Sequence, residues 1–209
     1  MFPARAIVKH GLLALLVYAL LLLAWPLVRL AYRPLFQAAG EFLFAVADPF
    51  GGEIRVRLES SSDSALAKDT PHMDTLVHLQ HRRFAGADSL AAASSFFHGY
   101  QPTAFLLALF LGATNLSWSL RRKRLLWALV LLQIFVGLRL YVGVFYAYAR
   151  SQIDGRPAIE LSAGASRCLF WLWHFTWAEP IATYVVPLTI WALFAFAERT
   201  LAAGEEAGV

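Results

Sequence analysis

Cysteine and charged residues are scarce in this chain of 209 residues. Cys168 is the only cysteine, which excludes an intrachain disulfide and any cysteine-rich metal site. Charged residues make up only 15% of the chain, apolar residues make up 59%, and the mean hydropathy is +0.56. One soluble core of this size could not bury so much apolar surface, whereas a bilayer removes the need to bury it. The composition therefore indicates an integral membrane protein.

Recognisable ligand-binding and catalytic motifs are also missing. The chain has no Gly-rich phosphate loop, no zinc-type His/Cys spacing and no Gly-x-Ser-x-Gly elbow. Internal repeats are not evident, so transport by inverted repeats is unsupported. His78 and His81 would point to opposite faces of a strand and would chelate a metal poorly. We expect no cofactor and no metal.

The basic run Arg121-Arg122-Lys123-Arg124 stands between two long apolar stretches. Short loops with clustered Lys and Arg stay on the cytoplasmic side of a membrane, so this run predicts a cytoplasmic hinge between two spanning helices. The formal charge of +4 is explained by orientation and lipid headgroups, and we expect no nucleic-acid partner. The first apolar stretch, from about Ile7 to Leu30, predicts an uncleaved anchor, because Ala45-Val46-Ala47 lies too far beyond it for a signal peptidase.

The predicted fold class is an all-α integral membrane protein. It has four transmembrane helices and a small outward-facing insertion, containing β structure, between helices 1 and 2. Pro180 and Pro187 predict a kink in the last helix. The predicted ranges are 1–30 (cytoplasmic N-terminus and first span), 31–101 (outward segment with a two-stranded sheet and an interfacial helix), 102–120 (second span), 121–124 (cytoplasmic hinge), 125–148 (third span), 149–167 (outward loop), 168–197 (kinked fourth span) and 198–209 (cytoplasmic tail).

Strict alternation of apolar and charged residues from Glu53 to Glu59 predicts a half-buried strand in the insertion. A weaker alternation from Asp74 to His81 predicts its antiparallel partner. Two strands alone are only marginally stable, so this sheet must pack on the bilayer, the helices or a partner. After it, Asp88 is a plausible N-cap for a helix through Phe97, which Gly99 would end.

Ionisable residues at bilayer depth are costly and mark the places where function is sought. Arg139 is expected about 14 Å deep in the third span, and Glu179 about 17 Å deep in the fourth, at about 1.5 Å per residue. They could meet as a pair that holds two helices together. Alternatively, Arg139, His174 and Glu179, with His98 at the outer mouth, form a pocket. Arg139 would then bind an anionic group and His174 would transfer a proton.

Arg139, Cys168 and His174 together resemble, in outline, exosortase-like membrane transpeptidases, which use Cys, Arg and His near the outer face. The resemblance covers three residue types and no motif, and it implies a thiol nucleophile at Cys168. The order departs from that family, whose nucleophile precedes its arginine, whereas Cys168 follows Arg139. Cys168 and His174 also lie about 120° apart around a helix, so they do not share a face.

Three functions remain open from the sequence. The first is a non-catalytic accessory or assembly subunit of a membrane or envelope complex, bound to membrane lipids and other membrane protein subunits. The second is a membrane enzyme that acts at the outer leaflet on a lipid-linked or anionic substrate. Its candidate catalytic residues are Arg139, His174 and Glu179. The third is a small transporter subunit. We expect a multi-pass protein of the bacterial inner membrane with both termini in the cytoplasm.

Overall fold

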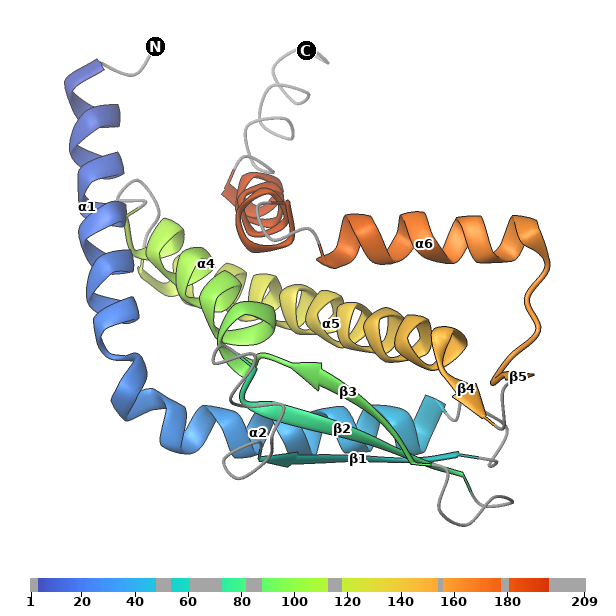
Figure 1. Ribbon diagram of the computed structural model, residues 1–209. Coiled ribbons are helices and arrows are strands. Elements are labelled where there is room, and N and C mark those ends of the chain that lie inside the picture. The colour runs from blue at the N-terminus through green and yellow to red at the C-terminus, as the bar shows by residue number, and fades with distance from the viewer. Residues whose placement is uncertain are drawn as a thin grey trace.

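The computed structural model describes residues 4–47, 54–60, 73–81, 88–112, 118–153, 156–177 and 181–195, and the structural statements below concern these residues. Helices dominate the fold, and a three-stranded sheet lies at one side of it (Figure 1). In chain order the elements are α1 (Ala4–Leu23), α2 (Trp25–Ala47), β1 (Ile54–Ser60), β2 (Thr75–His81), β3 (Asp88–Ala93), the π-helix η1 (Phe96–Tyr100), α4 (Gln101–Gly112), α5 (Trp118–Arg150), β4 (Gln152–Ile153), β5 (Arg156–Pro157), α6 (Ala163–Trp177) and the π-helix η2 (Ile181–Val185), which continues as an α-helix to residue 195.

Among the described helices, α5 alone is long and apolar enough to cross a membrane by itself. Its 33 residues reach about 50 Å at 1.5 Å per residue. The α1–α2 pair qualifies only as two halves bent by 73°, and α6 qualifies only with 181–195, at 59° to it. The described residues thus offer between one and three candidate spans, fewer than the four predicted.

The first predicted span, from about Ile7 to Leu30, is not one straight helix, because the chain bends at Ala24 between α1 and α2. Pro26 explains the bend, since it has no N–H to donate to the carbonyl one turn earlier and its ring crowds that turn. Backbone bonds resume at once, because the Val28 amide donates to the Ala24 carbonyl at 3.1 Å. α2 then runs beside the sheet in Figure 1.

The basic run 121–124 is part of a helix, not the loop predicted from the sequence. It occupies the first turns of α5, which begins at Trp118. Arg and Lys are good helix formers, and no Gly or Pro interrupts the chain before Gly137, so the helix continues through the run. Arg124 donates from Nη1 to the carbonyl of Phe194 at 2.8 Å. This bond joins the basic end of α5 to the last described helix.

Part of the predicted second span, 102–120, lies in α4, whose 12 residues end at Gly112 and extend about 18 Å. Residues 113–117 lie outside the described residues, and 118–120 already belong to α5. α4 packs closely on α1, because a Cβ added at Gly112 would lie 2.7 Å from the Cβ of Ala14.

The sheet has three antiparallel strands in the order β1-β2-β3, not the predicted two. The first pair was predicted correctly in place and direction: Leu58 lies opposite Val77 in the register. The third strand, β3, occupies residues predicted as a helix from Asp88. Its register pairs Val77 with Ala91, so bonding to β2 outweighs the helix propensity of the alanines. The helical turn starts only at Phe96 and passes through Gly99 into α4 without ending there.

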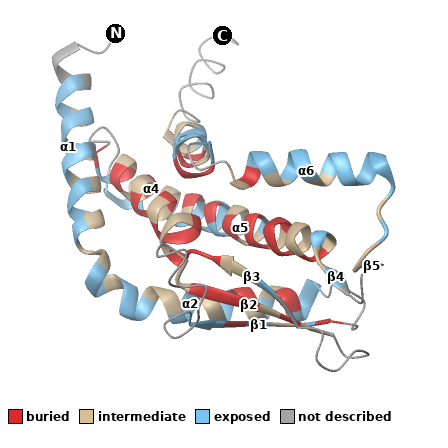
Figure 2. Ribbon diagram, in the orientation of Figure 1, coloured by how far each residue is buried: buried red, intermediate tan, exposed pale blue. Residues whose placement is uncertain are grey.

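The sheet shares its core with α2 and α5, which stabilises three short strands. A Cβ at Gly40 of α2 would lie 2.7 Å from Leu58 and 2.9 Å from Leu140, so the helix, the sheet and α5 meet at this glycine. The edge strand β1 is also held by a side chain, because the Leu58 amide donates to the Glu41 carboxylate at 2.9 Å. Figure 2 shows burial concentrated in α4, the sheet and the later part of α5, while α1 and α6 are largely exposed.

The predicted outward loop 149–167 contains ordered structure. β4 and β5 form a small antiparallel hairpin, and α6 starts at Ala163, five residues before the predicted start of the fourth span. Ser162 caps this helix, since its Oγ accepts from the Ala165 amide at 3.3 Å. Pro180, one of the two predicted kink residues, lies outside the described residues.

Candidate functional site

Arg139 lies at the centre of the fold with no exposed surface. Its Nη1 donates to the carbonyl of Phe97 in η1 at 3.1 Å. In return, the backbone carbonyl of Arg139 accepts from Nε1 of Trp177, the last residue of α6, at 3.0 Å. A single residue of α5 therefore connects two other elements that are far away in the sequence. We call Arg139, Phe97, His98, Gly143 and Trp177 the Arg139 centre.

Trp177 fits onto α5 because the residue one turn after Arg139 is Gly143, which has no side chain. A Cβ built at Gly143 would lie 2.0 Å from Cζ2 and 2.4 Å from Nε1 of the Trp177 ring. The same ring is 6.0 Å from the Arg139 guanidinium carbon, within the range of a cation–π contact. Glycine at position 143 thus permits both the close approach of the indole and its hydrogen bond to Arg139.

His98 packs against the other side of this arrangement. Its ring centroid lies 4.0 Å from that of Trp177, and its Nδ1 accepts from the Ser94 amide at 2.9 Å. An Nδ1 that accepts a hydrogen bond carries no proton, so His98 is neutral here. Burial and the nearby Arg139 charge agree with this, since they lower the pKa of His98 from 6.5 to about 3. His98 is therefore not a proton donor near neutral pH.

A chain of hydrogen bonds links the end of β3 to β2 and α2. Asp74 accepts from the Ser95 amide at 2.8 Å and from the Ser95 hydroxyl at 2.5 Å. The Thr75 hydroxyl donates to the same carboxylate at 3.2 Å and accepts from Gln37 of α2 at 3.4 Å. Asp74 thus orients the turn that carries His98 and the Phe97 carbonyl toward Arg139.

The other predicted site residues do not gather around Arg139. His174 is exposed on α6, where its ring contacts Phe170, Trp171 and Phe175 of the same helix. Cys168 is exposed as well. Glu179 lies outside the described residues. Arg139 and His98 both contact Trp177, whereas the described contacts of His174 place it with the aromatic residues of α6.

Gln133, another polar residue of the third predicted span, has a helix-to-helix contact. Its Nε2 donates to the hydroxyl of Thr103 in α4 at 3.2 Å. His78, one of the histidines considered as metal ligands, lies 3.7 Å from the Glu59 carboxylate across the β1–β2 pair. These polar groups connect neighbouring elements.

Comparison of the chain with protein-family models, with curated proteins and with solved structures finds no match.

The Arg139 centre is built to connect elements. A substrate anion would need access to the guanidinium, and Arg139 has none. Sequence reasoning found Arg139 because an arginine inside an apolar stretch is conspicuous. Sequence reasoning did not identify Gly143 or the role of Trp177. The one available indication was that Gly143 follows Arg139 by four residues, which places both on the same face of a helix.

Proposed function

We propose that this chain is a non-catalytic accessory or assembly subunit of a membrane complex. The burial of Arg139 carries the proposal. A catalytic or anion-binding arginine must reach its substrate, whereas this guanidinium has no exposed surface and donates to a backbone carbonyl. A charge that is costly to bury persists where it joins elements that must stay together.

The exposed aromatic surface of α6 supports the same proposal. Trp171 is 50% exposed and Phe175 is 55% exposed. Large apolar side chains that face outward in a membrane protein contact lipid or a neighbouring helix. Aromatic rings favour the boundary between the membrane and water. The membrane enzyme that acts through Arg139, His174 and Glu179 receives no comparable support, because His174 has its contacts on α6.

The proposed topology follows the charge rule. The basic run at the start of α5 lies in the cytoplasm, α5 crosses the membrane, and the three-stranded sheet lies outside. Both termini are cytoplasmic, and the membrane is the bacterial inner membrane. Cysteine labelling in intact cells tests this arrangement in a Cys168→Ser background. A reagent that does not cross the bilayer should label an Arg55→Cys variant and spare a Lys123→Cys variant, and the opposite pattern would reject the orientation.

Purification of the full chain from membranes in a mild detergent tests the assembly role. We expect a complex of defined mass that contains other membrane proteins in fixed stoichiometry. A monomer without partners would contradict the proposal. An intact complex that loses its biological activity in His174→Ala would favour the enzyme.

A further inference from the structure

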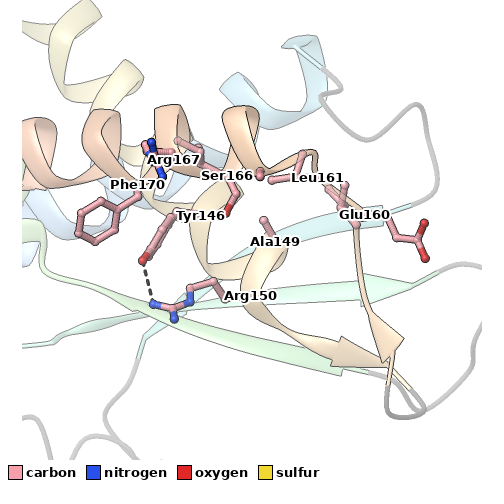
Figure 3. A pocket seen from close by; sticks show the side chains of 11 residues that line it. Tyr146, Ala149, Arg150, Glu160, Leu161, Ser166, Arg167 and Phe170 are labelled. Carbon is pink, nitrogen blue, oxygen red and sulfur yellow. Dashed lines mark hydrogen bonds between the residues drawn. The ribbon is translucent and has the colours of Figure 1, made fainter.

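A second polar region lies at the end of α5 opposite the basic run. An open pocket of about 740 Å³ lies between the last turns of α5, the segment 159–161 and the first turns of α6 (Figure 3). Its polar lining comes from two helices and the segment that joins them. The residues that matter for its chemistry are Tyr146, Arg150, Glu160, Ser166, Arg167 and Phe170.

The charge of this pocket favours an anion. Arg150 and Arg167 contribute two guanidinium groups, and Glu160 is the one carboxylate among the lining residues. Figure 3 shows the Glu160 carboxylate turned away from the other labelled side chains. Among the described residues, neither arginine forms an ion pair with a carboxylate. The start of α6 adds positive potential to the same region.

One arginine is already positioned by its neighbour. Arg150 donates from Nη1 to the Tyr146 hydroxyl at 2.9 Å, and its guanidinium carbon lies 5.5 Å from the centre of that ring. Tyr146 is itself stacked on Trp173 of α6, with 4.5 Å between ring centroids. These contacts limit the conformations of Arg150, and its second terminal nitrogen forms no hydrogen bond within the described part of the chain. A guanidinium held in this way can bind a phosphate in a bidentate manner.

The depth of the pocket identifies the source of the anion. About 20 helical residues are needed to cross the hydrocarbon layer. If Arg124 lies at one boundary of that layer, Val144 lies at the other. Tyr146 to Arg150 then lie in the headgroup layer. Between Arg124 and Arg150 the only charged residue is Arg139, which is fully buried. The apolar lining, including Phe170, suits the part of a lipid next to its headgroup.

We propose that this pocket binds the phosphate of an anionic membrane lipid through Arg150 and Arg167. The inference rests on one part of the proposed function, that α5 crosses a bilayer. The ligand carries a net negative charge, so a phosphatidylglycerol headgroup fits and a zwitterionic phosphatidylcholine headgroup fits less well. The lipid contacts the pocket at the outer end of α5, away from the basic run at its other end.

Native mass spectrometry of the full chain in detergent tests the site. Phosphatidylglycerol, phosphatidylcholine and inorganic phosphate are titrated separately, and the retained adducts are counted. We expect phosphatidylglycerol to bind in preference to phosphatidylcholine. Arg150→Gln with Arg167→Gln should weaken its binding roughly tenfold, which corresponds to about 1.4 kcal/mol. Arg55→Gln with Arg57→Gln is the matched control, because it removes two exposed arginines from β1, and its binding should equal that of the wild type.

The outcomes separate specific binding from general charge attraction. An equal loss in the control variant, or equal binding of the two lipids, would overturn the proposal. Competition by inorganic phosphate would show that the phosphate group alone is recognised, and it would assign the site to free phosphate if the lipid binds no better. Arg150→Lys with Arg167→Lys keeps the charge but not the guanidinium fork, so this pair should bind the lipid less tightly than the wild type. Binding equal to that of the wild type would overturn the bidentate contact.

The same samples distinguish this site from the assembly role. Loss of lipid adducts in the double Gln variant, with the mass of the complex intact, concerns the pocket alone. A monomeric wild type that still binds phosphatidylglycerol would reject the assembly role and leave the pocket standing.

Discussion

Replacement of Gly143 by alanine tests the packing of the Arg139 centre most directly. The new Cβ would lie 2.0 Å from Cζ2 and 2.2 Å from Cε2 of Trp177, atoms of a rigid ring that cannot give way locally. The whole indole must shift, which lengthens its bond to the Arg139 carbonyl and disturbs its contact with His98. Overpacking alone costs about 1–3 kcal/mol, and a lost hydrogen bond adds about 1 kcal/mol. The better helix propensity of alanine offsets about 0.5–1 kcal/mol of this cost, so we expect a destabilisation of about 1–3 kcal/mol.

Gly137→Ala on the same helix is the matched control. Its added Cβ would lie 3.5 Å from Leu43, an ordinary contact. Alanine is the better helix former by about 0.5–1 kcal/mol, so this variant should be as stable as the wild type or more stable. Thermal unfolding in detergent, followed by tryptophan fluorescence, measures both. At about 2–4 °C per kcal/mol, Gly143→Ala should unfold at a temperature roughly 2–12 °C lower than the wild type. Equal midpoints for the two variants would refute the packing of Trp177 on α5.

Three further predictions concern single contacts. Arg139→Ala should reduce the amount of folded protein in the membrane, because it removes the bond to the Phe97 carbonyl. Arg139→Lys should restore part of that amount. Full restoration by lysine would exclude a need for the guanidinium geometry. In the unfolded chain His98 takes up a proton below pH 6.5, whereas in the folded chain, where its pKa is about 3, it stays neutral. The contribution of His98 to the free energy of unfolding is therefore complete above pH 6.5. It falls by up to about 1.4 kcal/mol per pH unit between pH 6.5 and 3. His98→Gln should unfold with a shallower pH dependence, and parallel curves would contradict this. Glu41→Ala should cost about 1–2 kcal/mol, measured by thermal unfolding, because it leaves the Leu58 amide without its acceptor, and Glu41→Gln should retain most of the stability.

The strands show where local pattern succeeds. Glu53 to Glu59 alternates strictly, and the structure places β1 over nearly the same residues. β3 has three alanines and one serine with no apolar alternation, so its conformation comes from its hydrogen bonds to β2. The start of α5 also differs from the prediction. The basic run looked like a loop because of its charge, yet its residues favour a helix and the chain continues through it.

Arg139 shows where the sequence is informative about the centre of the fold. A charge in an apolar stretch has to be hidden, and the structure hides it completely. Its partners could not be inferred, because the Phe97 carbonyl is a backbone atom that every residue has. Nothing in the residues next to Trp177 along the chain indicates its hydrogen bond to α5.

Composition and hydropathy by themselves determined that this chain is mostly helical, that it contains a helix able to cross a membrane, and that it carries a small antiparallel sheet. These properties follow from the amount and period of apolar residues, which act locally and over whole segments. Only the tertiary structure decided the third strand and the joining of η1, α5 and α6 at Arg139. Each of these depends on contacts between residues far apart in the chain, and such contacts form only when the elements pack together.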